Sequence, residues 1–586
     1  MFKCKQLLRR ICVVSYVFLL CGGLVNASNL VSKTNTLIGT QGNGWASGYL
    51  YPGATYPFGM VQFTPTYFTK QLGFVINQLS GAGCDHMGNF PTLPIAGALR
   101  VSPDSILNMQ TPVGKEIGTA GYYAATVDHS IRAELTVTER TGMARYTFSS
   151  KEKQGTVIIG GGVAATSIQV AAIKITGPHS CEGYAEGGAF CGIPTPYKVY
   201  FVAEFDADAE SFGTWKEERL HANHTFAEGS HSGVYFTFPL KEGNQAVQYK
   251  IGVSYVSVEN ARENLRVENP AWDFSAVRQA TQDKWNEYLG KIEVEGDNED
   301  RQMQFYTHLY RSLIHPNVCS DVNGEYMGAD SQVHKTARKF YTSFSNWDTY
   351  RTQTALIAML APEETSDIVM SHYLFAEQSG GGFPRWVLAN IETGVMQGDP
   401  TPILVANAYA FGARNYDPRT LLRTMRYGAE VPGANSQGVL TRPGLEQYLE
   451  KGYYDASILL EYTSSDFAIG RFALQACNDE PVCNWYTQRA MNWKNLFNKE
   501  TGWLQSRNED GSWKRYDADW RESTYKNYFW MVPYDLQGLI DSIGGKEAAE
   551  KRLDEMFRRL DASYGDEWFA SGNEPSFQIP WIYNWA

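Results

Sequence analysis

The chain has 586 residues, more than a single hydrophobic core usually organises, so two or more domains are expected. Aromatic residues make up 13% of it, with 35 Tyr and 15 Trp, a composition that suits stacking on sugar rings and equally a large, well-packed core. The net charge is −12 and no basic run follows residue 10, which argues against a nucleic-acid partner, because phosphate binding needs clustered Lys and Arg.

Residues 1–27 predict a secretory signal peptide. Basic residues at the start precede an apolar run from Ile11 to Leu20, which is too short to span a bilayer comfortably. The run Val25 to Ala27 places small residues where a cleavage site needs them. The alternative is a lipoprotein signal at Cys21, although Leu20 stands where a small residue is wanted. No later stretch predicts a membrane span, so a secreted or periplasmic protein is expected.

The cysteines after residue 27 are compatible with disulfide bonds in an oxidising compartment. Cys181 with Cys191, and Cys477 with Cys483, are close enough in sequence to close local loops, but spacing does not determine the connectivity. No CxxC, HExxH, Walker A or GxGxxG pattern occurs, so zinc, ATP and dinucleotide sites have no support.

Residues 28–272 are predicted to form a β-sandwich domain. Apolar and polar residues alternate at 131–138, 156–160, 198–205 and 249–256, and clusters of Gly, Asn, Asp and Ser separate such segments. Short strands between turns of this kind are typical of a sandwich.

Residues 273–297 predict a linker that consists of a helix over about 275–289 and a short bridge. From 298 onward, apolar residues recur at helical spacing, and nine or ten helices are expected up to about residue 560. The prediction is a multidomain α+β protein, with a sandwich followed by an (α/α)6 toroid over 298–586. A complete toroid needs twelve helices, so this one is expected to be incomplete.

Glu522 lies in a segment rich in aromatic residues, among them Trp520, Tyr525 and Trp530. Apolar surroundings raise the pKa of a carboxyl group, which is the property that a general acid in glycoside hydrolysis needs. The alternative is a surface glutamate that pairs with the neighbouring Arg521.

Asp348 lies beside a tryptophan in the segment Trp-Asp-Thr-Tyr-Arg, residues 347–351. A carboxylate there can accept hydrogen bonds from two adjacent hydroxyl groups while the ring of Trp347 packs on a pyranose. The alternative is that Asp348 caps the helix that follows. A second segment, Gly-Asn-Glu-Pro-Ser at 572–576, has the Gly and Pro punctuation of a loop at a cleft.

These motifs resemble those of the calcium-dependent exo-α-mannosidases of glycoside hydrolase family 92, and the resemblance extends over nearly the whole secreted chain. The family's block Glu-x5-Tyr-x-Trp-x-x-Pro-x-Asp is matched by Glu522, Tyr528, Trp530, Pro533 and Asp535. The chain departs from the family at Ser523-Thr524, Lys526 and Tyr534, which bears on the specificity for the leaving group. Further matches lie at 51–61, 80–84, 347–351, 380–386 and 573–576.

The resemblance implies roles for particular residues. Glu522 is the expected general acid. The expected substrate-binding residues are Trp347, Asp348, Arg351, Arg385, Asp399, Glu574 and, from a sandwich loop, Cys84. The expected cofactor is Ca²⁺, held by Asn573, Glu574 and Gln578, whose carboxylate and amide oxygens are hard ligands.

The function that this implies is removal of terminal α-linked mannose from a mannose-containing oligosaccharide or glycan, by calcium-dependent hydrolysis with inversion. The family keeps its general base as an Asp some tens of residues past the Asn-Glu-Pro segment, and the sequence has no such position before Ala586. The first alternative is therefore a truncated, inactive chain that still binds mannosides. The second is another sandwich-plus-toroid enzyme, such as a glucoamylase or a glycoside phosphorylase, although those lack this set of motifs.

Overall fold

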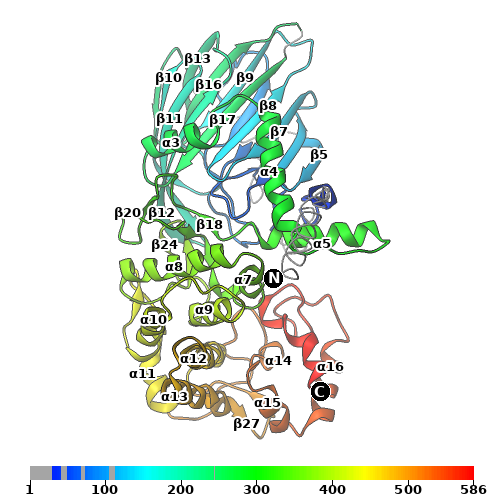
Figure 1. Cartoon of the computed structure of the whole chain (residues 1–586), viewed down its shortest axis with the longest axis vertical. Helices are drawn as coiled ribbons and strands as arrows, with labels where there is room; N and C mark the ends of the chain where they lie inside the picture. Colours follow the sequence, from blue (N-terminus) through cyan, green and yellow to red (C-terminus); the bar gives the residue numbers. More distant parts are fainter. Residues whose placement is uncertain (1–28, 41–48, 67–72, 105–112, 243–244) are drawn as a thin grey trace, which may run out of the picture.

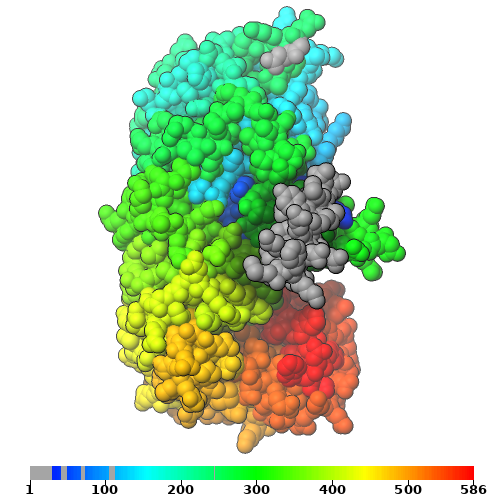
Figure 2. All heavy atoms as spheres, in the orientation of Figure 1, coloured from blue at the N-terminus to red at the C-terminus, as the bar shows by residue number. Residues whose placement is uncertain are grey.

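The structure is a computed structural model that describes residues 29–40, 49–66, 73–104, 113–242 and 245–586. The predicted signal peptide lies outside these residues. In Figure 1 the strands form the upper half of the molecule, the helices the lower half, and the C-terminus lies at the lower right edge. Figure 2 shows that the two halves are in broad contact, with the last residues, in red and orange, beside the helices in yellow.

Two antiparallel sheets make up the upper half, and this confirms the predicted sandwich. Among the described residues, one sheet has eight strands in the order β1-β2-β3-β4-β9-β16-β13-β14 and the other has nine in the order β15-β10-β11-β12-β17-β8-β7-β6-β5. The strands are β1 Ala54–Thr55, β2 Gln62–Pro65, β3 Phe74–Val75, β4 Thr92–Ala96, β5 Val113–Thr119, β6 Tyr122–Val127, β7 Ile131–Val137, β8 Thr141–Thr147, β9 Gln154–Gly160, β10 Ile168–Gly177, β11 Ser180–Phe190, β12 Ile193–Phe205, β13 Ser211–Lys216, β14 Arg219–Ala222, β15 Phe226–Glu228, β16 Ser232–Pro239 and β17 Ala246–Ser254.

The burial pattern of residues 131–137 explains why they form strand β7. Ile131, Ala133 and Leu135 are fully buried, whereas Arg132 and Glu134 between them are only partly covered. Because successive side chains of a strand point to opposite faces, this alternation buries one face of β7 in the core between the sheets.

Two helices connect the sandwich to the lower half. Helix α3 (Val258–Glu268) packs on β17 and β12, and α4 (Phe274–Leu289) packs on β7. Each begins with a side-chain cap, Ser257 for α3 and Asp273 for α4. The buried indole of Trp285 in α4 donates a hydrogen bond to the carbonyl oxygen of Thr55 (2.7 Å), which fastens the helix to the start of the sandwich.

The lower half is helical, and between residues 299 and 556 ten of its helices are longer than one turn. The longest, α12, packs against α9, α10 and α13 and is buried along most of its length. The helices are α5 Glu299–Ser312, α6 Asn346–Thr349, α7 Gln353–Leu360, α8 Pro362–Ser379, α9 Thr401–Ala410, α10 Pro418–Glu430, α11 Leu445–Lys451, α12 Ala456–Cys477, α13 Glu480–Ala490, α14 Tyr525–Tyr528, α15 Leu536–Ser542 and α16 Lys546–Met556.

Short strands and 3₁₀ turns lie between these helices. The strands are β18 Asn317–Val318, β19 Glu325–Met327, β20 Val333–Lys335, β21 Tyr341–Thr342, β22 Phe344–Ser345, β23 Trp386–Leu388, β24 Ile391–Glu392, β25 Asn435–Ser436, β26 Val439–Leu440, β27 Phe497–Asn498 and β28 Trp503–Leu504. Two 3₁₀ turns, η4 Glu574–Ser576 and η5 Ile579–Asn584, end the chain.

A disulfide bond joins Cys84 to Cys191, and neither of the local pairs suggested by spacing is bonded. Cys181 lies near the start of β11 and Cys191 directly follows its end, so an almost fully extended segment separates them by about 33 Å. Cys477 and Cys483 are free thiols on either side of the α12–α13 turn. Closeness in sequence therefore does not predict the disulfide pairing here, because an extended strand separates residues that are near one another in sequence.

Candidate active site

Two adjoining cavities lie where the sandwich meets the helical half. The first has a volume of about 350 Å³ and the second of about 250 Å³, and five residues line both: Gly81, Ala82, Asp348, Trp386 and Glu574. Glu522 lines the first cavity only. Together these cavities are large enough for a small-molecule ligand, and they bring three carboxyl groups from distant parts of the sequence to one place.

Glu522 is half-buried in the wall of the first cavity. Burial raises the pKa of its carboxyl group, while a hydrogen bond with the Asn573 side chain and the charge of Arg521 oppose this shift. In this part of the chain, which is fully described, no ion pair within 4.0 Å joins Glu522 to Arg521. The backbone of Glu522 has a φ of 48°, a strained conformation for a residue with a side chain, and such strain is common at functional sites. A half-buried acid fits this environment better than a surface glutamate paired with Arg521.

The segments around Glu522 and Glu574 lie side by side. The Asn573 side chain donates a hydrogen bond to the backbone oxygen of Glu522 (2.5 Å), and the Ser576 hydroxyl donates to the Asn527 side chain (2.9 Å). Turn η4 thereby lies along α14, the helix that follows Glu522. The two segments that stood out in the sequence thus form one wall.

Asp348 and Glu574 form a mutually repelling pair of carboxyl groups. Burial raises the pKa of Asp348 well above its usual value, and the charge of Glu574 raises it further. Burial also raises the pKa of Glu574, and the charge of Arg351 opposes the shift at both groups. Asp348 caps neither neighbouring helix, because α6 and α7 lack side-chain caps. A positive ligand or a set of sugar hydroxyl groups between these carboxyl groups would relieve the repulsion.

Trp347 and Arg351 are not among the residues that line these two cavities. The Trp347 indole is fully buried and donates to Glu461 (3.1 Å), so its face is closed to a sugar. Arg351 forms a buried ion pair with the same Glu461 (3.1 Å). The expected direct contacts of Trp347 and Arg351 with substrate have no support in this geometry. The positive charge of Arg351 opposes the rise in the pKa of both Asp348 and Glu574.

Glu461 is a residue that the sequence analysis missed. It lies in the first third of α12, fully buried, and accepts hydrogen bonds from the Tyr350 hydroxyl (2.9 Å) and the Tyr528 hydroxyl (3.5 Å) as well as from Trp347 and Arg351. It therefore connects the Trp-Asp-Thr-Tyr-Arg segment to the Glu522 segment. The signal that could have revealed it is a carboxylate directly after the apolar run from Ile458 to Leu460.

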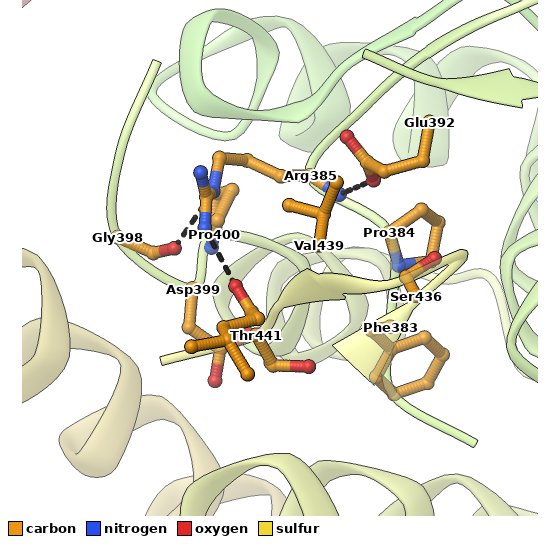
Figure 3. Close-up of a pocket in the computed structure, with 11 residues that line it drawn as sticks. Phe383, Pro384, Arg385, Glu392, Gly398, Asp399, Pro400, Ser436, Val439 and Thr441 are labelled. Atoms are coloured by element: carbon orange, nitrogen blue, oxygen red, sulfur yellow. Dashed lines mark hydrogen bonds between the residues drawn. The ribbon is translucent and has the colours of Figure 1, made fainter. Parts of the chain in front are cut away.

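Arg385 and Asp399 are also placed away from the cavities. Figure 3 shows the Arg385 guanidinium turned toward the Gly398 carbonyl, while its backbone N–H meets Glu392. Further bonds go to the carbonyls of Gly394, Met396 and Leu440. The space that Arg385 and Asp399 line measures about 10 Å³, room for about one water molecule and not for a sugar. Neither residue lines the two larger cavities, and their expected contact with substrate stays a prediction.

The sandwich supplies the part of the first cavity's lining that does not come from the helical half. Cys84 lines it as half of the disulfide with Cys191, and Phe190 lines it while its ring stacks on Trp386 at 4.2 Å between centroids. Of these three residues, only Cys84 was expected from the sequence as a site residue. The position of Trp386 at the end of the matched segment 380–386 was an available signal, whereas nothing in the sequence placed Phe190 there.

Two histidines, the buried His86 and the partly buried His315, hold the sandwich loop that lines both cavities. His86 Nε2 accepts a hydrogen bond from the Leu79 N–H (2.7 Å), and His315 Nε2 accepts one from the Ser80 N–H (2.8 Å). Because Nε2 of His86 is an acceptor, its Nδ1 carries the proton and donates to the Cys84 carbonyl (2.6 Å). Burial lowers the pKa of each ring to about 4, so both are neutral at pH 7.

Stability is therefore expected to fall with acidification. Each ring takes up a proton in the unfolded chain near pH 6.5, the ordinary pKa of histidine, but in the folded chain only near 4, so folding is progressively opposed as the pH falls from 6.5 to 4. The loss is about 3 kcal/mol for each ring. Urea unfolding across this range should show it, and His86→Gln should reduce it. The exposed His129, changed to Gln, is the matched control, and an unchanged slope in His86→Gln would contradict this account.

Asn573 and Glu574 line the first cavity, whereas Gln578 is not among the lining residues of either cavity. The Gln578 amide donates instead to the Pro575 carbonyl (3.1 Å). Within the described ranges, no group of three His, Cys, Asp or Glu side chains converges as a metal site. The hard oxygens near one another are the carboxylates of Asp348 and Glu574 and the amide oxygen of Asn573. Oxygen ligands of this kind suit a divalent cation such as Ca²⁺ better than a soft metal.

Comparison with known families accounts for both halves. The model of the glycosyl hydrolase family 92 N-terminal domain matches residues 34–254, and that of the family 92 catalytic domain matches residues 260–586. An uncharacterized secreted glycosidase of Arthroderma benhamiae is 25% identical, over 95% of this chain and 77% of its own length.

Solved structures agree with these matches. A family GH92 α-mannosidase from Bacteroides thetaiotaomicron superposes with a TM-score of 0.86 at 26% identity, over 95% of this chain and 78% of its own; it has also been solved with mannoimidazole. A GH92 inverting mannosidase from the same organism superposes with a TM-score of 0.84 at 25% identity, over 95% of this chain and 80% of its own.

Proposed function

Because the chain belongs to glycosyl hydrolase family 92, we propose that this glycoside hydrolase removes terminal α-linked mannose from oligosaccharides or glycans. The observation that carries the proposal is the convergence of Glu522, Asp348 and Glu574 on two adjoining cavities at the junction of the two halves. The mannosidases with the same fold support mannose as the sugar.

In this proposal Glu522 is the general acid. Burial keeps its carboxyl group protonated to a higher pH than that of a free glutamate, so it holds a proton to donate to the glycosidic oxygen. Asp348 and Glu574 bind hydroxyl groups of the terminal mannose, and the charge of Arg351 lowers the cost of burying their charge. In single displacement, a base on the opposite face of the sugar activates water. We assign the role of this base to none of the residues that line the two cavities.

The chemistry is tested by the anomer first released. An α-mannoside should yield β-mannose, observed by NMR before mutarotation, because single displacement inverts the anomeric carbon. Release of α-mannose would indicate double displacement and contradict the proposed division of roles. Binding of mannosides without any hydrolysis would favour the alternative of an inactive mannoside-binding chain.

The proposed cofactor is Ca²⁺, held by Glu574 and Asn573 with Asp348 close by. When bound, the ion would supply positive charge beside the sugar hydroxyl groups. Gln578 belongs to the expected ligand set, although its amide contacts the backbone of η4.

Chelation tests the cofactor. Exhaustive chelation is expected to lower both mannoside affinity and the thermal midpoint, and Ca²⁺ should restore both better than Zn²⁺ does, because the candidate ligands are oxygens. Glu574→Gln should abolish the calcium-dependent stabilisation, whereas Glu567→Gln, outside the cavity linings, is the matched control. A midpoint unaffected by chelation would argue against the site.

We also propose that the protein is secreted. The support is the signal-like sequence at 1–27 and the name of the related fungal protein. In the part of the chain that the structure describes, no helix combines the length and the apolar character needed to cross a membrane.

A further inference from the structure

Glu522 lies in a segment whose backbone is strained at two positions. Asp519 has a φ of 63° and Glu522 a φ of 48°, and neither residue is a glycine. Such a conformation is unfavourable for a residue with a side chain and persists only where the surroundings hold it. The contacts that hold this segment therefore determine where the carboxyl group of Glu522 lies.

Helix α12 contacts the start of this segment through Ser457. The Ser457 hydroxyl donates a hydrogen bond to the carbonyl oxygen of Asp519 (2.7 Å), and the Ser457 backbone N–H donates to the same oxygen (3.3 Å). Ser457 is buried, so water competes little for either bond. The carbonyl that α12 holds in this way lies three residues before Glu522.

The same helix contacts the end of the segment through Glu461. The Tyr528 hydroxyl, six residues after Glu522, donates to the Glu461 carboxylate (3.5 Å) and accepts a hydrogen bond from the Gln397 amide (3.0 Å). The Gln397 amide oxygen lies 3.1 Å from the Ser457 hydroxyl. Because residues four apart lie on one face of an α-helix, Ser457 and Glu461 hold both ends of residues 519–528 from one face of α12.

Glu461 is itself fixed from the other side. Its carboxylate also accepts hydrogen bonds from Trp347, Tyr350 and Arg351, so it keeps its place without the bond from Tyr528. The loop that carries Gln397 approaches α12 closely at Gly398, which has a φ of 76°. A Cβ atom on Gly398 would lie only 2.5 Å from the Cβ of Glu461, so this approach requires glycine.

We infer that this clamp, defined as Ser457, Glu461, Gln397 and Tyr528, positions Glu522 for proton donation. The inference rests on the proposed function, because it takes Glu522 as the general acid. The four members are positioning residues, since none of them lines either of the two junction cavities. Positioning matters because a general acid transfers its proton only within hydrogen-bonding reach of the leaving oxygen, and a small displacement slows the reaction.

Two variants remove a single hydroxyl group from the clamp and leave the ion pair of Glu461 intact: Tyr528→Phe and Ser457→Ala. The matched control is Tyr462→Phe in the same helix, whose buried hydroxyl donates to the Pro443 carbonyl (2.7 Å) and takes no part in the clamp. We would measure kcat and KM on two α-mannosides, one with a poor leaving group and one with a very acidic leaving group. Urea unfolding checks that each variant is folded.

Tyr528→Phe and Ser457→Ala are each expected to lower kcat about tenfold on the poor leaving group and to leave KM unchanged, since each removes one buried hydrogen bond that holds the acid. The acidic leaving group needs little protonation, so its kcat should fall much less. Tyr462→Phe should match the wild-type protein on both substrates.

Three results would overturn the inference: equal losses on both substrates, wild-type kcat in both folded variants, or the same loss in Tyr462→Phe. A merely structural role would lower the urea midpoint and affect the two substrates alike. If the wild-type chain hydrolyses neither mannoside, the proposed function fails, and the positioning role with it.

Discussion

Glu522→Gln is expected to lower turnover of mannosides with poor leaving groups by about 10²–10⁴-fold, the range that general-acid catalysis contributes. The amide has nearly the same shape but cannot donate the proton that the departing oxygen needs. A substrate whose leaving group is very acidic needs less protonation and should be partly spared.

The comparison between the two substrates decides the role of Glu522. A loss that is small and equal for both would remove it from the role of acid. Glu509→Gln is the matched control, because that carboxyl group has a side chain that is 87% exposed and lines neither cavity. The affinity for mannoimidazole should change little in Glu522→Gln, which would show that the site is still folded.

Arg442→Leu is expected to cost about 3–5 kcal/mol of unfolding free energy, because it removes one partner from a buried network of charges. The Arg442 side chain is fully buried between Asp399 (2.8 Å) and Asp466 (2.7 Å). Its charge opposes the rise that burial causes in the pKa of Asp399. Without it, Asp399 would have to be protonated or rehydrated, and the loops around Arg385 would loosen.

Chemical unfolding monitored by tryptophan fluorescence measures this cost. The matched control is Arg426→Leu, which breaks an i,i+4 pair with Glu430 on the surface of α10 and should cost no more than about 1 kcal/mol. A cost in Arg442→Leu as small as that of the control would show that the network does not stabilise the helical half.

The sequence carried most of the information about the fold. Alternation with a period of two, as at 131–138, predicts strands because it reflects which face of a sheet is buried, and the helical spacing after residue 298 reflects the same property of helices. The motifs around Glu522 and Glu574 also identified two segments that the structure brings together. Their chemical roles remain predictions that the experiments above address.

The tertiary structure alone decided which cysteines form a disulfide bond and in which direction the side chains of the motifs point. The sequence favoured no bond between Cys84 and Cys191, because their proximity depends on how β11 and β12 lie over the loop at 80–84. Trp347, Arg351, Arg385 and Asp399 belong to motifs that match the family, yet their side chains turn into buried networks away from the cavities. A motif specifies residue types along the chain. Whether a side chain lines a cavity or points into the protein interior depends on packing between segments that are far apart in sequence.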